Sequence, residues 1–262
     1  MRQRGWIARG VVVLTIAFAC TEVGTDPTVP VAIEIDPPLL PAMAVGDTLR
    51  DTVGVVAPIV ARALNSRNEV IPDAPITFVA LPNDSILDVD PETGIVVGNV
   101  VGQGNVVAQV AGLQSVRLPV RVTNRPDTVF TDSALVDSVL YGIADDTART
   151  LVVSVMARDT VDGRDTLIAV AFWRARYTIT SPEGLAENTD TTRVYMANSA
   201  NRLSRVDTTD TNGDATRRIR FPLAVVSDTA RRTFVTEVVV LGADGTPLPG
   251  SPVVFTTVIR PR

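Results

Sequence analysis

The sequence contains no histidine and no lysine, and its only cysteine is Cys20. Without histidine there can be no Ser-His-Asp triad, no Cys-His pair and no imidazole metal site. A lone cysteine excludes an intramolecular disulfide and the structural zinc sites that are built on Cys and His ligands. The chain therefore lacks the side chains of much hydrolytic and zinc chemistry, and we expect neither an enzyme nor a cofactor.

Aromatic side chains make up only 5% of the 262 residues, whereas hydrophobic residues as a whole make up 45%. Buried cores must therefore be filled by Val, Ile, Leu and Ala. The abundant β-branched residues favour strands, because they pack well on a pleated surface. After residue 20 no segment shows the sustained i, i+3, i+4, i+7 apolar spacing of a helix. The sequence predicts an all-β protein whose length suits about two domains.

A basic stripe is also missing, since the formal net charge is −5 and the arginines are scattered among aspartates. Proteins that bind nucleic acid usually carry such a stripe. Nucleotide-binding proteins usually carry a Gly-rich loop between a strand and a helix, and we find no such loop. We therefore expect no nucleic-acid partner and a surface of mixed charge.

The amino terminus has the pattern of an export signal. Three arginines among the first nine residues precede an apolar stretch from Val11 to Phe18. This stretch is shorter than the ~20 residues that a membrane-spanning helix needs. Alanines stand one and three positions before Cys20, where a signal peptidase reads small residues. These features predict a signal peptide over residues 1–19.

Residues 16–20, Ile-Ala-Phe-Ala-Cys, resemble a bacterial lipobox, whose cysteine is acylated and becomes the mature amino terminus. The resemblance implies that a lipid on Cys20 attaches the protein to a membrane. Because Thr21 rather than Asp follows, it also implies an outer-membrane or cell-surface location. Simple secretion, with Cys20 incidental, is the alternative. Residues 20–30 are polar and contain proline, which predicts a flexible tether.

Residues 31–123 have the short apolar runs and intervening turns of a β-sandwich. In the last run Pro119 cannot donate to a ladder, so this strand is expected near a sheet edge, with Val116 on its buried face. The expected strands are residues 31–35, 58–64, 76–81, 95–101, 105–111 and 116–122.

Four segments of this region resemble the bacterial Ig-like domain, group 2, in order and spacing. They are Gly46-Asp47-Thr48, Ile76-Thr77-Phe78, residues 89–96 (Val-Asp-Pro-Glu-Thr-Gly-Ile-Val) and residues 102–108 (Gly-Gln-Gly-Asn-Val-Val-Ala). Phe78 stands where the family usually has Trp, and residues 50–58 look like a small insertion. The family occurs in adhesins and other surface proteins, so the resemblance implies a scaffold rather than a reaction.

Residues 127–262 are predicted to form a second, divergent Ig-like β-sandwich. Asp162-Gly163 suits a tight hairpin turn. Trp173 is expected between the sheets, on the face opposite Arg174 and Arg176, and a ligand platform is the alternative for this side chain. Residues 210–216 and 245–255 resemble the invasin-like group 1 bacterial Ig-like domains, although the latter segment would normally stand early in a domain. The expected strands are residues 151–158, 167–179, 217–223, 235–241 and 252–259.

One loop offers candidate metal ligands. Asp207, Asp210, Asn212 and Asp214 present oxygen atoms at close spacing, with an intervening glycine, which suits calcium. The loop lacks a distal bidentate Glu, and a solvated turn explains the same residues without a metal. We interpret the repeated Asp-Thr pairs of the chain in the same way, as turn and strand-end residues.

The whole sequence predicts two tandem Ig-like β-sandwich domains after an N-terminal signal peptide. We expect a non-enzymatic cell-envelope lipoprotein that acts as a surface scaffold or adhesion module, with a protein or glycan as its partner. Two alternatives stay open. One is a structural spacer or accessory subunit of an envelope complex, and the other is a secreted, unanchored Ig-like protein.

Overall fold

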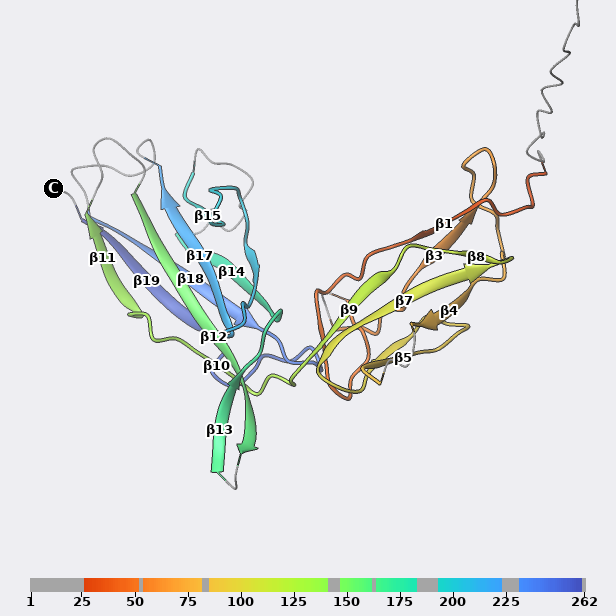
Figure 1. Cartoon of the computed structure of the whole chain (residues 1–262). Coiled ribbons are helices and arrows are strands. Elements are labelled where there is room, and N and C mark those ends of the chain that lie inside the picture. Colours follow the sequence, from red (N-terminus) through yellow and green to blue (C-terminus); the bar gives the residue numbers. More distant parts are fainter. Residues whose placement is uncertain are drawn as a thin grey trace, which may run out of the picture.

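The computed structural model describes residues 26–51, 54–81, 85–140, 147–161, 164–182, 193–222 and 231–260. Every regular element in these ranges is a β-strand, and none is a helix long and apolar enough to cross a membrane. The strands form two bodies joined end to end (Figure 1). The expected signal peptide and Cys20 lie outside the described residues.

The first sandwich is made of the nine strands that precede residue 124. One sheet has the order β2-β9-β7-β4, with β8 paired to β7, and the pairs β1-β3 and β5-β6 pack against it. The short β2 runs parallel to β9. The strands are β1 (Ala32–Ile35), β2 (Met43–Ala44), β3 (Ala61–Leu64), β4 (Thr77–Ala80), β5 (Leu87–Val89), β6 (Val96–Gly98), β7 (Gly102–Val110), β8 (Leu113–Gln114) and β9 (Leu118–Thr123).

The second sandwich has two sheets of five strands. Their orders are β10-β12-β17-β15, with β13 paired to β12, and β11-β19-β18-β14-β16. The strands are β10 (Thr128–Phe130), β11 (Val136–Leu140), β12 (Thr147–Val161), β13 (Arg164–Ala169), β14 (Arg174–Ser181), β15 (Tyr195–Ala197), β16 (Val206–Thr208), β17 (Asp214–Phe221), β18 (Arg232–Val240) and β19 (Val253–Arg260).

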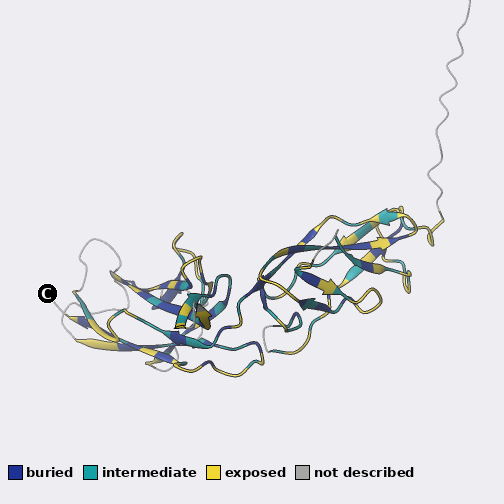
Figure 2. Ribbon diagram, turned by 60° about the horizontal axis from the view of Figure 1, so that its bottom comes forward, coloured by how far each residue is buried: buried dark blue, intermediate teal, exposed yellow. Residues whose placement is uncertain are grey.

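Strand order makes both bodies Ig-like. In the second sandwich the opening segment is divided between the sheets, because β10 pairs with β12 whereas β11 runs parallel to β19. The long strands then separate into β12 and β17 on one sheet and β14, β18 and β19 on the other, as in an Ig fold. Buried residues alternate along the strands of both bodies, as Figure 2 shows. The predicted all-β fold of two tandem sandwiches is confirmed.

One predicted strand is wrong. The expected strand at residues 167–179 is broken, since β13 ends at Ala169 and β14 begins at Arg174, in the other sheet. Between them Phe172 has φ of 62°, a left-handed conformation that ends a strand. Apolar alternation continues through the break because Val170 and Trp173 are both buried, so the pattern could not reveal the crossing.

Two other predictions concern strand neighbours. β12 and β13 form the expected hairpin, with Val161 opposite Arg164, although the turn at 162–163 lies outside the described residues. Pro119 of β9 pairs with Asn105 of β7, and on its other side β2 reaches only the last two residues of β9. Val116 does not lie on the buried face of this strand as expected, because it precedes β9 and is 76% exposed.

The described end of the expected tether is held by the first sandwich. Asn65 Nδ2 donates to the Pro27 carbonyl at 3.3 Å, and Val31 N donates to the Leu64 carbonyl at 2.8 Å. Thr28 N donates to Asp26 Oδ1 at 2.9 Å, which closes a local turn. Residues 26–30 are therefore fixed at the end of the first sandwich that is remote from the second (Figure 1).

Candidate functional site: a pocket between the sandwiches

The two sandwiches are in direct contact. Only residues 124–127 separate β9 from β10, and Pro126 among them is buried. Ala44 of the first sandwich is fully buried and belongs to the hydrophobic core of the second. The Arg121 guanidinium lies 3.9 Å from the centroid of the Phe172 ring. A contact of this kind stabilises by about 0.5–1 kcal/mol at an exposed site and by more when it is desolvated.

Phe172 is held in its left-handed conformation by hydrogen bonds to one residue. Phe172 N donates to the Thr209 carbonyl at 2.8 Å, and Trp173 N donates to Thr209 Oγ1 at 2.8 Å. Thr209 Oγ1 in turn donates to the Val170 carbonyl at 2.5 Å. Such a conformation costs about 1–3 kcal/mol for a residue with a side chain, so the surrounding contacts must maintain it. They aim the Phe172 ring at the first sandwich.

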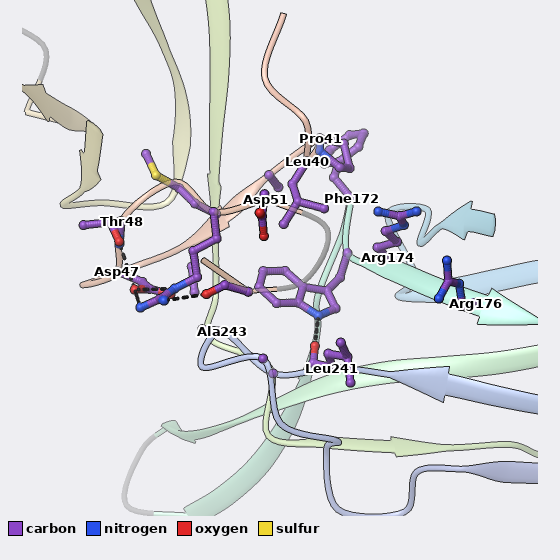
Figure 3. Close-up of a pocket in the computed structure, with 18 of the residues that line it drawn as sticks. Leu40, Pro41, Asp47, Thr48, Asp51, Phe172, Arg174, Arg176, Leu241 and Ala243 are labelled. Carbon is purple, nitrogen blue, oxygen red and sulfur yellow. Dashed lines mark hydrogen bonds and ion pairs between the residues drawn. The ribbon is translucent and has the colours of Figure 1, made fainter. Parts of the chain in front are cut away.

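A cavity of about 320 Å³ opens at this contact, and Figure 3 shows the side chains that line it. Residues 40–51 and Gly54 of the first sandwich form one side, and β14 with residues 239–245 of the second sandwich forms the other. Met43, Ala44, Trp173 and Ala243 are buried and give it an apolar floor. Trp173 Nε1 donates to the Leu241 carbonyl at 2.8 Å, so the indole is fixed in orientation. Trp173 is buried in the second core, as expected, and it also lines the pocket.

Asp47, Arg50 and Asp51 on the first-sandwich side are engaged within that sandwich, whereas Thr48 Oγ1 is buried without a hydrogen-bond partner in the described part of the chain. Asp47 and Arg50 form an ion pair at 2.9 Å, and Arg50 Nη1 donates to the Gly54 carbonyl at 2.8 Å. The hydrogen bond to Asp47 raises the pKa of Arg50, and burial opposes it. Asp51 Oδ1 accepts a hydrogen bond from Val55 N at 2.9 Å. These groups therefore stiffen the loop that closes one side of the pocket.

The second-sandwich side is cationic. Arg174, Arg176 and Thr178 alternate on the outer face of β14 and line the pocket, whereas Ala175 and Tyr177 face the core. Burial, followed by the nearby positive charge of Arg176, lowers the pKa of Arg174. Within the described part of the chain, neither guanidinium has a hydrogen bond or an ion pair.

The backbone around Gly54 of the first sandwich lies very close to the backbone around Gly245 of the second sandwich. A Cβ atom at Gly54 would lie 2.9 Å from the Gly245 Cα, a distance that real Cβ atoms do not show. Gly54 also has φ of 89°, which favours glycine. A side chain at position 54 would therefore push the sandwiches apart.

Of the residues predicted as calcium ligands, Asp210 and Asn212 lie in the turn between β16 and β17, Asp207 lies in β16, and Asp214 begins β17. Asp210 Oδ1 accepts hydrogen bonds from Asn212 N at 2.8 Å and from Asp214 N at 3.0 Å. Asp207 pairs with Arg217 at 2.7 Å, and Asp214 Oδ1 accepts from the Ser154 hydroxyl at 2.5 Å. The turn interpretation accounts for these contacts. No group of three or more Asp, Glu, Cys or His side chains in the described ranges is arranged to hold a metal.

The sequence did not predict the pocket. The sequence placed Arg174 and Arg176 opposite Trp173, and the burial pattern of β14 bears out that alternation. Nothing in the sequence indicated that residues 40–51 and Gly54 would lie against them. Phe172 and Trp173 are consecutive bulky residues inside the expected strand 167–179, with no turn residue to mark the break.

No protein-family model matches the sequence, and no curated protein matches it. Among solved structures, the chain is 14% identical to domains 4 and 5 of the S-layer protein SbsC (87% of this chain, 97% of that chain, TM-score 0.31). It is 13% identical to the Yersinia pseudotuberculosis adhesin InvE (87%, 58%, TM-score 0.32). It is also 13% identical to fibronectin(III)-like modules of Clostridium thermocellum CbhA (88%, 94%, TM-score 0.32). These scores are too low to support a functional argument, and the Ig-like assignment rests on strand order.

Proposed function

We propose that the chain is a non-enzymatic lipoprotein of the cell envelope, attached through Cys20, whose two sandwiches serve as a surface scaffold and binding module. The observation that carries the proposal is the tandem arrangement in Figure 1. The described chain enters at the free end of the first sandwich and leaves at the free end of the second. Attachment before residue 26 would therefore hold the second sandwich away from the membrane.

Two features support a role without catalysis. The chain has no histidine, which excludes the commonest general base. In the pocket, Asp47 is paired with Arg50, and Asp51 is hydrogen-bonded within its loop, so no pair of carboxylates is poised as acid and base. The site is built from an apolar floor and a cationic side, which suits binding.

An open strand edge in the second sandwich supports contact with a macromolecular partner. The β12–β13 hairpin projects from the body of the sandwich near the junction (Figure 1). Within the described residues β13 pairs only with β12, so its other edge offers backbone donors and acceptors. Leu167 on this strand is 51% exposed. An extended segment of a partner could add to such an edge as a further strand.

The test of attachment is mass spectrometry of the mature amino terminus, with membrane fractionation of the Cys20→Ser variant beside it. The proposal expects an acylated Cys20 as the first residue, and release of the variant from the membrane fraction. An unmodified Cys20 in a freely secreted product would contradict attachment and favour the secreted alternative.

The test of binding is adherence of cells that make the chain to surfaces coated with matrix proteins or glycans. Deletion is expected to lower adherence, and restoration with the wild-type chain to recover it. A Leu167→Asp chain is expected to recover it less well than a Val116→Asp chain, which places the same charge at an exposed site of the first sandwich. Equal recovery would exclude the β13 edge as the contact.

A second candidate is a structural spacer, favoured by the short linker and by Ala44 lying in the core of the second sandwich. A spacer would keep two envelope components at a fixed separation without a saturable external partner. Deletion would then alter envelope integrity and leave adherence unchanged. The same deletion strain therefore separates the two candidates.

A further inference from the structure

We propose that the pocket between the sandwiches is a binding site for a small amphiphilic carboxylate, with its carboxylate against Arg174 and Arg176 and its apolar body on the floor beside Trp173. The inference does not depend on attachment through Cys20 or on the β13 edge. It follows from the charge, shape and pairing of the side chains around the cavity.

The cationic side supplies the recognition of charge. Residues two apart on a strand share a face and lie about 6–7 Å apart, so both guanidinium groups reach the same space. Each guanidinium presents a planar fork of donors that matches the two oxygens of a carboxylate. An anion would also relieve the repulsion between Arg174 and Arg176 that contributes to the lowered pKa of Arg174. On the adjacent strand Glu237 stands opposite Thr178, and no ion pair joins it to either arginine.

The opposite side limits the charge of the ligand. Asp47 and Asp51 line the pocket from the first sandwich. Arg50 offsets the charge of Asp47 at 2.9 Å, so the repulsion that an anionic ligand meets from this side is reduced but not removed. A monoanion can approach the arginines without a large penalty from these carboxylates, whereas a dianion such as phosphate meets stronger repulsion. The arrangement thus favours a carboxylate.

The floor supplies the recognition of an apolar body. Met43 and Ala44 are 2% and 0% exposed, and Trp173 is 7% exposed, so the floor is packed before a ligand arrives. A volume of about 320 Å³ lies at the lower end of the range of small-molecule sites, about 300–1,000 Å³. An inorganic anion would leave the apolar floor unfilled, whereas a short aliphatic or aromatic chain would cover it.

A ligand in this position contacts both sandwiches at once. Because only the joined arrangement presents the complete pocket, ligand binding must stabilise the contact between the sandwiches by linkage. The ligand would thus act as a clamp on the Arg121–Phe172 contact, which lies on the same interface.

The chain carries its own optical probe for the test. It has two tryptophans, Trp6 and Trp173, so Trp6→Phe leaves Trp173 as the single reporter. The full-length Trp6→Phe chain is titrated with 4-phenylbutyrate, with 4-phenylbutan-1-ol and with inorganic phosphate. The inference expects a saturable change in Trp173 fluorescence with 4-phenylbutyrate at concentrations below about 1 mM. The alcohol and phosphate are expected to bind at least ten-fold more weakly.

Variants assign the effect to the cationic side. R174Q/R176Q is expected to weaken 4-phenylbutyrate binding at least ten-fold, whereas R67Q/R164Q, which removes two exposed arginines outside the pocket, leaves it unchanged. If R174Q/R176Q does not fold, judged by circular dichroism, the single variant R176Q at an exposed position carries the test.

Three outcomes overturn the inference. The first is no saturable change with 4-phenylbutyrate up to about 1 mM. The second is binding of the alcohol or of phosphate as tight as that of 4-phenylbutyrate. The third is unchanged affinity in the folded arginine variant. None of these outcomes bears on attachment or adherence, so failure of this inference leaves the proposed function standing.

Discussion

The two sandwiches share a strand order but are filled differently. Between residues 26 and 123 the only aromatic residue is Phe78, and the first core is otherwise built from Val, Leu, Ile, Ala and Met. The second core buries Tyr177, Phe221, Phe234 and Phe255 completely. Phe221 and Phe234 pack with ring centroids 5.0 Å apart. A buried aromatic ring removes much more apolar surface from water than Val does. Burial therefore contributes more stabilising free energy per residue in the second core than in the first.

The second sandwich also buries charge. The Arg149 side chain, 5% exposed, donates from Nη1 to the Thr256 carbonyl at 2.8 Å and from Nη2 to the Ala134 carbonyl. Its Nε lies 3.6 Å from a carboxylate oxygen of Asp137. Arg149 thus ties β12 to β19 and to the segment before β11, which lie in the opposite sheet. Within the described residues no arginine of the first sandwich is buried in this way.

The first sandwich depends on tight turns of a kind that the second also has. Gly94, with φ of 71°, places its Cα where an added Cβ would lie 2.5 Å from the Ile59 carbonyl oxygen. Asp90 Oδ1 accepts hydrogen bonds from Glu92 N at 3.0 Å and from Thr93 N at 2.8 Å in the same turn. The second sandwich has turns of the same kind, since an added Cβ at Gly213 would lie 2.6 Å from the Val155 carbonyl oxygen. The two sandwiches thus share exact turn geometry and differ in how their cores are filled. Four changes test this.

The largest effect is expected from Phe255→Ala in the second core. Truncating a fully buried phenylalanine should lower the free energy of unfolding by about 3–5 kcal/mol, from lost burial and the cavity left behind. Urea unfolding followed by Trp173 fluorescence measures it. Val254→Ala, at a neighbouring site that is 41% exposed, should change stability little. Equal losses in both variants would contradict the assigned core.

Next comes Gly94→Ala in the first sandwich. The strained backbone and the contact with Ile59 should together cost about 3 kcal/mol, at the upper end of the range for such strain. Gly46→Ala is the matched control, because Gly46 has φ of 74° but no atom within 4 Å of the added Cβ. That variant should lose only about 1–2 kcal/mol. Hydrogen exchange of the β7 amides measures the stability of both variants. An equal loss in Gly46→Ala and Gly94→Ala would contradict the role of the contact with Ile59.

Arg149→Met should have an intermediate effect. Methionine fills much of the same space but leaves the Thr256 and Ala134 carbonyls without their donor, which should cost about 1–3 kcal/mol. The loss should appear in the Trp173 unfolding transition. Arg158→Met, an exposed arginine on the same strand, should be nearly neutral. A stability gain in Arg149→Met would show that the buried charge destabilises the second sandwich, so that its hydrogen bonds between the sheets do not compensate for its burial.

The smallest effect concerns the loss of stability at low pH. The backbone and side-chain hydrogen bonds from Thr93 lower the pKa of Asp90, and those from Thr246 lower the pKa of Asp244 in the second sandwich. A lowered folded-state pKa gives stability that is present above the unfolded value of about 3.9 and is lost as pH falls through the folded value. Asp90→Asn keeps an acceptor but cannot titrate. It should therefore reduce the loss of first-sandwich stability between about pH 6 and about pH 3, measured by urea midpoints. An unchanged pH dependence would contradict the role of this turn.

Much of the fold was predictable because its strands are regular. Alternation along β9, β14 and β19 follows directly from one buried face, and glycine and aspartate marked the turns. The crossing at residues 170–173 was not predictable, because apolar residues continue through it. The pocket was not predictable either. It depends on how residues 40–51 and Gly54 of one sandwich meet β14 of the other, and no local pattern encodes that contact.

The junction supports both proposals, because it positions the second sandwich and completes the pocket. Spin labels at Val116 and Val136, both exposed, in a Cys20→Ser chain allow the distance between the sandwiches to be measured by pulsed electron paramagnetic resonance. A fixed junction predicts a single narrow distance distribution that broadens in Arg121→Gln, where the contact with Phe172 is lost. A broad distribution in the chain with Arg121 intact would show that the sandwiches move independently, and would contradict both the fixed spacing and the preformed pocket.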